Sequence, residues 1–109
     1  MGVTKTEKFS QAQNDMAAMA KALAHPARVA IIQHLIKANA CINGDLVNEL
    51  GLAQATISQH LRELKAIGLI QGTIEGTSVS YCIAPVKWKE VQNTFGALFD
   101  GFGSNFDCC

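Results

Sequence analysis

The sequence predicts a mainly α-helical domain with one small β-hairpin before its last helix. Apolar residues recur at helical spacing in five segments, and the pattern changes once to the alternation typical of a β-strand. With 109 residues, of which 49% are hydrophobic and 17% charged, the chain has the size and composition of one folded domain. We expect this domain to cover residues 1–103 and a flexible, cysteine-containing tail to follow at 104–109.

The first two elements are expected to be amphipathic helices. Apolar residues repeat at helical spacing over residues 11–24 and favour one helix there. His25 and Pro26 interrupt this pattern, because a proline biases the residue before it out of the helical conformation and suits the first turn of a new helix. A second helix is therefore expected from Pro26 to about Asn39.

Two shorter helices joined by a tight connection come next. Leu46 begins the third helix, which ends at Gly51, a residue type that favours helix termination. The fourth helix is expected over residues 54–66, and Gly68 closes it. Its inward-facing residues are expected to be Ile57, Leu61 and Leu64. Two short helices joined through a glycine fit a helix-turn-helix.

The pattern after the fourth helix changes to that of a β-hairpin. Strand-forming runs at residues 69–74 and 79–83 flank a turn, and Tyr81 is expected to face inward whereas Cys82 faces outward. Pro85 then opens a last helix. The order of elements is therefore that of a winged helix-turn-helix, with an amphipathic helix at each end.

The last helix carries a heavy apolar stripe at helical spacing. The stripe consists of Trp88, Val91, Phe95, Leu98 and Phe99. Such a stripe lines either a small-molecule pocket or a protein interface. Because the first helix offers Met16, Met19 and Leu23 as partners, the interface of a homodimer is the favoured interpretation.

Three segments between Lys21 and Pro85 resemble the arsenic-repressor (ArsR/SmtB) family of metalloregulators. They read KALAHPARVAIIQHL, LVNELGLAQATISQHLRELKAIGLI and VSYCIAP. The resemblance implies a homodimer formed by the terminal helices. It also implies a transcriptional repressor that places each fourth helix in a major groove of double-stranded operator DNA.

The chain departs from the usual pattern of that family at three points. The predicted wing at residues 71–82 contains no Lys or Arg, so we expect only weak wing contacts with DNA. The Cys-x-Cys pair that often precedes the position of Asp45 is replaced by Ile42 and Gly44. The last helix has no histidine, which removes the usual zinc pairing there.

The fourth helix supplies the candidate DNA contacts. Gln and Arg side chains bond adenine and guanine edges, and Ser and Thr bond bases or phosphates. The exposed face is expected to present Gln54, Ala55, Thr56, Ser58, Gln59 and Arg62. Lys65 and Arg28, together with Lys37, are expected to contact phosphate. His60 is expected to pack beneath the wing rather than touch DNA.

Cys41, Cys108 and Cys109 form the candidate inducer site. Arsenite or antimonite prefers thiolate ligands, and the flexible tail allows the adjacent pair to reach Cys41. The alternative is a disordered tail with inert thiols and a small buried Cys41, and both interpretations stay open. We expect no resident cofactor, and zinc is less favoured because the sequence lacks a four-ligand pattern.

The predicted function is a sequence-specific repressor that is derepressed by a thiol-binding inducer such as arsenite. One alternative is a thiol redox-sensing repressor of the same fold. Another is a winged-helix protein-interaction module that does not read DNA, which the formal net charge of zero favours. The sequence shows no catalytic motif, so we expect no enzyme. It shows no membrane span or secretory signal, so we expect a cytoplasmic protein.

Overall fold

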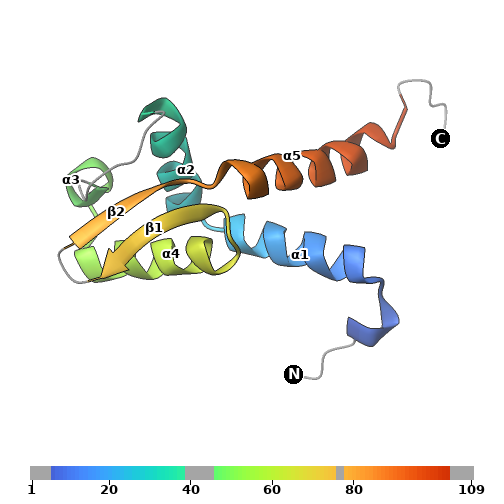
Figure 1. Cartoon of the computed structure of the whole chain (residues 1–109), viewed down its shortest axis with the longest axis horizontal. Coiled ribbons are helices and arrows are strands. Elements are labelled where there is room, and N and C mark those ends of the chain that lie inside the picture. Colours follow the sequence, from blue (N-terminus) through green and yellow to red (C-terminus); the bar gives the residue numbers. More distant parts are fainter. Residues whose placement is uncertain (1–5, 39–45, 76–77, 104–109) are drawn as a thin grey trace.

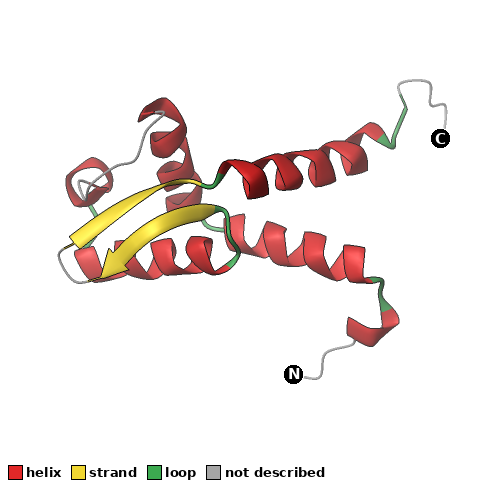
Figure 2. Cartoon of the chain, viewed as in Figure 1, coloured by secondary structure: helices red, strands yellow, loops and turns green. Residues whose placement is uncertain are grey.

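The computed structural model describes residues 6–38, 46–75 and 78–103. These residues form helices and one two-stranded antiparallel sheet, in the predicted order (Figures 1 and 2). The elements are the 3₁₀-helix η1 (Thr6–Lys8), α1 (Gln11–Leu23), α2 (Pro26–Ala38), α3 (Leu46–Leu50), α4 (Gln54–Ala66), β1 (Ile70–Glu75), β2 (Ser78–Ile83) and α5 (Pro85–Asp100).

Local hydrogen bonds determine where α1 begins and α2 follows. The Ser10 hydroxyl accepts from the Gln13 backbone N–H at 3.0 Å, and the Gln13 side chain accepts from the Ser10 N–H at 2.9 Å. This reciprocal pair is a capping box, which satisfies amides that a helix start leaves without partners. At the next junction, the Nδ1 atom of His25 accepts from the Ala27 N–H at 3.0 Å. His25 therefore caps α2, whose first residue, Pro26, has no N–H to satisfy.

The core is built around the inner face of α4. Ile57, Leu61 and Leu64 are buried there, as the sequence predicted. They pack in one cluster with Ile31 from α2 and Tyr81 from β2. Because a buried aliphatic side chain contributes about 1.5–3 kcal/mol relative to an exposed one, this cluster is the main source of stability for α4.

The β-hairpin lies over α4 and α2 (Figure 1). Its register pairs Gly72 with Tyr81 and Gln71 with Cys82. Gly72 has a φ of 132°, and a Cβ at this position would overlap the carbonyl oxygen of Ser80, so only glycine fits. Tyr81 faces inward as predicted, and Cys82 is half-buried, with its sulfur 3.9 Å from the side-chain nitrogen of Gln71.

The two long terminal helices, α1 and α5, extend to the same side of the molecule (Figure 1). They contact each other, and they run in opposite directions because the chain enters along α1 and leaves along α5. The helix-turn-helix and the wing therefore lie at one end, and the start of α1 and the end of α5 lie at the other. Within the described part of the chain, no helix is long and apolar enough to cross a membrane.

Candidate nucleic-acid interface

The polar face of α4 is directed to solvent. Gly51, with a φ of 69°, makes the turn that separates α3 from α4, and Ala53 precedes α4 without a side-chain cap. The exposed residues on this helix include Gln54, Ala55, Thr56, Gln59, Arg62 and Lys65. All six were predicted to face DNA, and their contacts with DNA stay predictions. The Gln59 amide donates to the Glu63 carboxylate at 3.0 Å, so its position on the surface is already constrained.

Ser58 does not belong to the exposed face, and its predicted placement there was wrong. It is 9% exposed, and its hydroxyl accepts a hydrogen bond of 3.0 Å from the Gln54 side chain. Ser58 follows the inward-facing Ile57 and lies one helical turn before Leu61, so it falls at the edge of the buried face. Its hydroxyl therefore orients Gln54, and a contact of Ser58 with DNA stays a prediction.

Arg28 connects three helices from the base of the interface. Its Nε atom donates to Nδ1 of His60 at 3.0 Å, and its Nη1 atom donates to the carbonyl oxygen of Ala22 at 3.1 Å. These bonds join α2 to α4 and to the end of α1. The geometry favours an internal role for Arg28, and the phosphate contact expected from the sequence stays a prediction.

His60 is buried within α4, at 7% exposed, which confirms that it packs inside the protein, whereas its place beneath the wing stays a prediction. The centroid of its ring lies 4.4 Å from the centroid of the His25 ring, and the two ring planes are inclined at 53°. Burial lowers the pKa of His60, as do the neighbouring His25 and Arg28, whereas Glu63 acts in the opposite direction. A neutral His60 accepts at Nδ1 and carries its proton on Nε2. The link to Arg28 was not predicted, since no sequence pattern marks a contact between helices so far apart in the chain.

The wing presents a polar surface without basic residues. Gln71, Thr73 and Ser80 are exposed on its two strands. The sequence has no Lys or Arg between residues 71 and 82, so the wing has no cation with which to hold a phosphate. Among the residues that the structure describes, every Lys and Arg lies on a helix, so these helices supply the positive charge for DNA.

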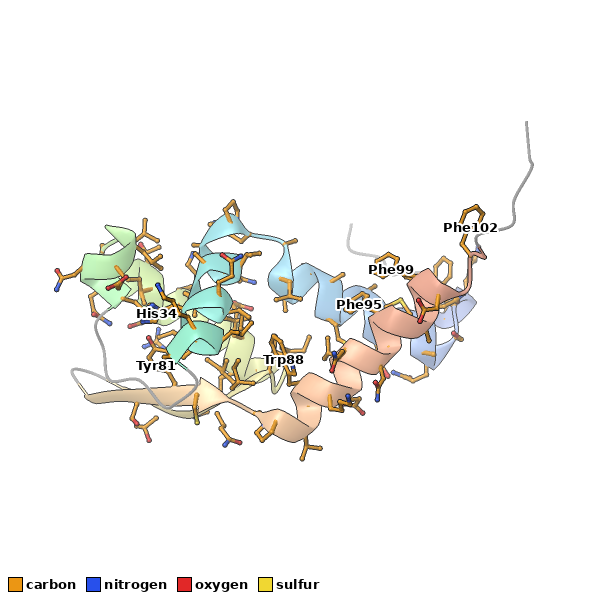
Figure 3. All side chains as sticks on the ribbon, turned by 90° about the horizontal axis from the view of Figure 1, so that it is seen from above. His34, Tyr81, Trp88, Phe95, Phe99 and Phe102 are labelled. Atoms are coloured by element: carbon orange, nitrogen blue, oxygen red, sulfur yellow. The ribbon has the colours of Figure 1, made fainter. Side chains whose placement is uncertain are left out.

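The apolar stripe of α5 divides into two parts. Trp88, Val91 and Phe95 turn toward the protein, where they line a cavity of about 340 Å³. Leu98 and Phe99 are exposed near the outer end of the helix, and Phe102 follows them (Figure 3). Only this outer part has the exposure that a protein interface requires. The first part of the stripe therefore fits a pocket, and the outer part fits an interface.

The predicted inducer site, formed by Cys41, Cys108 and Cys109, lies outside the described residues. Among the residues that are described, no cluster of three or more His, Cys, Asp or Glu side chains is arranged to hold a metal ion. Cys82, which the sequence analysis left out of the site, is a free thiol on the wing.

Comparison with known proteins identifies the family. The model of the bacterial regulatory proteins of the arsR family matches residues 25–71. The nodulation protein NolR of Rhizobium meliloti is 31% identical over 86 residues, which cover 79% of this chain and 67% of NolR. The chain belongs to the ArsR family. The transcriptional repressor SmtB of Mycobacterium tuberculosis is 41% identical over 64 residues, or 59% of this chain. That match spans 47% of SmtB, so the chain matches about half the length of this relative.

A solved structure supports the same fold. HlyU from Vibrio cholerae N16961 superposes with a TM-score of 0.63 and 25% identity, over 84% of this ArsR-family chain and 98% of HlyU. The winged helix-turn-helix predicted from the sequence is thereby confirmed. The relatives are transcriptional regulators, in agreement with the prediction that this chain is not an enzyme.

Proposed function

We propose that this ArsR-family chain is a sequence-specific DNA-binding repressor of transcription. The observation that carries the proposal is the exposed polar face of α4, which is supported from behind by the buried Ile57, Leu61 and Leu64. Gln54 and Arg62 on this face are side chains of the types that read adenine and guanine in the major groove. The match to SmtB, which is named a transcriptional repressor, supports repression as the outcome.

The proposed repressor binds as a homodimer. Phe99, at 70% exposed, and the neighbouring Leu98 and Phe102 form an apolar surface on and just beyond α5, and a second copy would cover this surface. Phe9, at the start of α1, is also exposed. A two-fold dimer would present its two α4 helices to successive major grooves, about 34 Å apart, on an inverted-repeat operator.

The proposed inducer is arsenite or antimonite, bound by thiolates of Cys41, Cys108 and Cys109. Binding would favour a form of the dimer with poorer spacing of its α4 helices. A coupling free energy of about 1–3 kcal/mol lowers DNA affinity several-fold to about a hundredfold, which suffices for derepression. This step rests on the preference of soft metalloids for sulfur.

Fluorescence anisotropy of the DNA upstream of the gene tests both parts of the proposal. We expect salt-sensitive binding that arsenite weakens. Replacing Cys108 and Cys109 by Ser should abolish the arsenite effect, whereas the matched variant Cys82→Ser on the wing should retain it. Tight DNA binding that is unchanged by arsenite would support the repressor but contradict the metalloid as its inducer. Non-reducing mass spectrometry of the protein after mild oxidation distinguishes a disulfide-forming redox sensor.

The absence of Lys and Arg from the wing and the formal net charge of zero favour one alternative, a protein-interaction module that does not read DNA. Such a module would show no salt-dependent affinity for duplex DNA. A repressor instead weakens steeply as salt rises, because each phosphate contact releases counterions. Absence of binding to the upstream region and to a genomic fragment library would support the module.

A further inference from the structure

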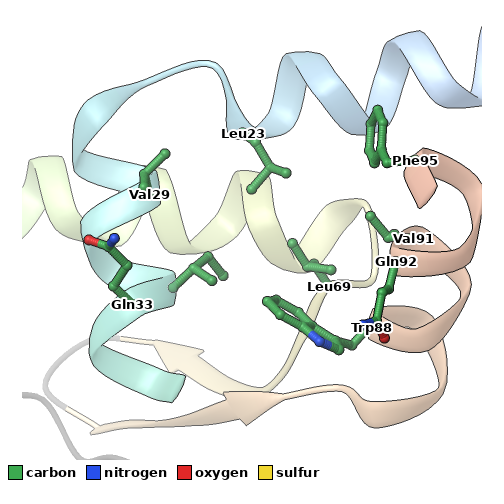
Figure 4. A pocket seen from close by; sticks show the side chains of 9 residues that line it. Leu23, Val29, Gln33, Leu69, Trp88, Val91, Gln92 and Phe95 are labelled. Carbon is green, nitrogen blue, oxygen red and sulfur yellow. The ribbon is translucent and has the colours of Figure 1, made fainter. Parts of the chain in front are cut away.

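A cavity of about 340 Å³ separates α5 from α2 (Figure 4). Three elements and the residue before the wing supply its walls. The lining residues are Leu23 of α1, Val29, Ile32 and Gln33 of α2, Leu69, and Trp88, Val91, Gln92 and Phe95 of α5. Its size lies within the range of small-molecule sites in proteins, about 300–1,000 Å³.

The lining determines what kind of molecule would bind. None of these lining residues, all of which are described, is charged, so an ion entering the cavity would lose hydration without gaining a partner. The lining is almost wholly apolar; the Gln92 side chain lies beside Trp88, where its amide can donate and accept hydrogen bonds, whereas the Gln33 amide is turned away from Trp88 (Figure 4). The indole of Trp88 offers a flat aromatic surface for stacking. A neutral aromatic molecule with a polar substituent matches all three features.

The volume sets the size of this molecule. An apolar cavity of about 150 Å³ is known to hold one benzene ring. A cavity of about 340 Å³ therefore admits two fused rings with a small substituent. Val29, at 42% exposed, lies at the opening and leaves a route from solvent.

We propose that this cavity binds a neutral two-ring aromatic molecule carrying a hydrogen-bonding group, and that this molecule is an effector of DNA binding. The effector role rests on the proposed function, whereas binding itself does not. A bound ligand would contact α5, which carries the surface proposed for dimerisation, and α2, which Arg28 joins to α4. It would also contact Leu69, between α4 and β1. Filling the cavity therefore couples the separation of α5 and α2 to the position of α4.

The tryptophan content of the chain provides a direct test of binding. Trp88 is the single tryptophan and lines the cavity, so its fluorescence reports on an occupant. The probe is aminomethylcoumarin, a neutral two-ring molecule that accepts excitation energy from tryptophan. We expect the fluorescence of Trp88 to fall to a constant level as the probe is added to the protein and fills the cavity. The anionic acetate derivative of the same coumarin should bind at least ~10-fold more weakly, because its carboxylate finds no cation in the cavity.

Two substitutions make the test specific to the cavity. Val29→Phe adds bulk at the opening and should weaken probe binding at least ~10-fold, since a buried ring loses its space. Val86→Phe is the matched control, because Val86 lies on α5, is 85% exposed and is not part of the lining. If Val29→Phe fails to fold, Gln92→Glu serves instead, since it keeps the shape but removes the donor for the coumarin carbonyl.

The outcomes separate binding from the effector role. Absence of saturable quenching would overturn the site, and this is also the result expected if a second copy of the chain fills the cavity. Equal affinity of Val29→Phe and wild type for the probe would overturn it as well. Quenching that leaves DNA anisotropy unchanged would overturn the effector role alone. Saturable quenching in a protein that binds no DNA would retain the site and contradict the proposed repressor instead.

Discussion

The Nε atom of Arg28 donates a hydrogen bond of 3.0 Å to the Nδ1 atom of His60. This bond connects α2 to the middle of the helix proposed to read DNA, and a second bond extends from Arg28 to the Ala22 carbonyl at the end of α1. Bonds from a single guanidinium therefore connect three helices. Because a guanidinium presents its donors in a fixed planar arrangement, lysine would not reproduce both contacts.

Arg28→Ala should destabilise the protein by about 1–3 kcal/mol, because it leaves the buried Nδ1 atom of His60 without its donor. Urea denaturation followed by circular dichroism measures this loss. Arg62→Ala removes the same side-chain type from an exposed position and should stay within about 0.5 kcal/mol of wild type. Equal stabilities of the two variants would contradict the structural role of Arg28.

Stability should fall when the solution is acidified. Burial is the largest cause that lowers the pKa of His60 below its ordinary value of 6.5, followed by His25 and Arg28. The unfolded chain therefore takes up a proton at this residue more readily than the folded protein does. The contribution of neutral His60 is fully present above about pH 6.5 and is lost as the pH falls through the lowered pKa.

His60→Asn isolates this contribution, since the Asn side-chain oxygen approximates the position of Nδ1 and has no comparable titration. Urea midpoints measured from neutral pH to about pH 5 should decline less in His60→Asn than in wild type. A parallel decline in both proteins would contradict the assignment. Nitrogen NMR of the imidazole provides a second check, because the bond from Arg28 requires the tautomer protonated at Nε2.

Arg62→Ala should weaken operator binding about 10- to 100-fold, the range that corresponds to the loss of one bidentate base contact. Lys89→Ala is the matched control, because it also removes one exposed positive charge but lies on α5 rather than α4. Fluorescence anisotropy of labelled operator DNA gives both affinities. Similar losses would indicate a general charge effect and not base recognition by this face of α4.

Two glycine substitutions should act in opposite directions. Gly72→Ala places a Cβ against the Ser80 carbonyl and imposes a φ of 132° on a residue with a side chain, so a loss of about 2 kcal/mol or more is expected. Gly96→Ala lies inside α5 with open space around it, and alanine there should stabilise the helix by about 0.5–1 kcal/mol. Thermal unfolding followed by circular dichroism distinguishes the two.

Phe99→Asp should convert the proposed homodimer to a monomer, because a carboxylate placed in an apolar interface loses its hydration without a partner. Sedimentation velocity measures the assembly, and circular dichroism checks that the helices remain. Val86→Asp introduces the same charge on α5 at a position 85% exposed and should leave the assembly unchanged. A wild-type protein that sediments as a monomer at micromolar concentration would contradict the proposed dimer.

The sequence by itself determined the elements and their order. Helical spacing, Pro26, Pro85 and the glycine turns act over a few residues, so their effect is readable without the fold. The first helix ends at Leu23 and was predicted to end one residue later, which is the usual uncertainty of a helix terminus. The inward face of α4 was also predicted correctly, because one buried stripe dominates its pattern.

Only the tertiary structure decided how residues distant in sequence are used. Ser58 lies at the edge of the buried face, where helical periodicity alone does not separate exposed from buried positions. Arg28 and His60 meet because α2 and α4 pack together, and no local preference brings them into contact. The stripe on α5 divides between cavity and surface according to which neighbours each turn of the helix meets. Periodicity reports the faces of an element, whereas the partner of each face is determined by packing across the whole chain.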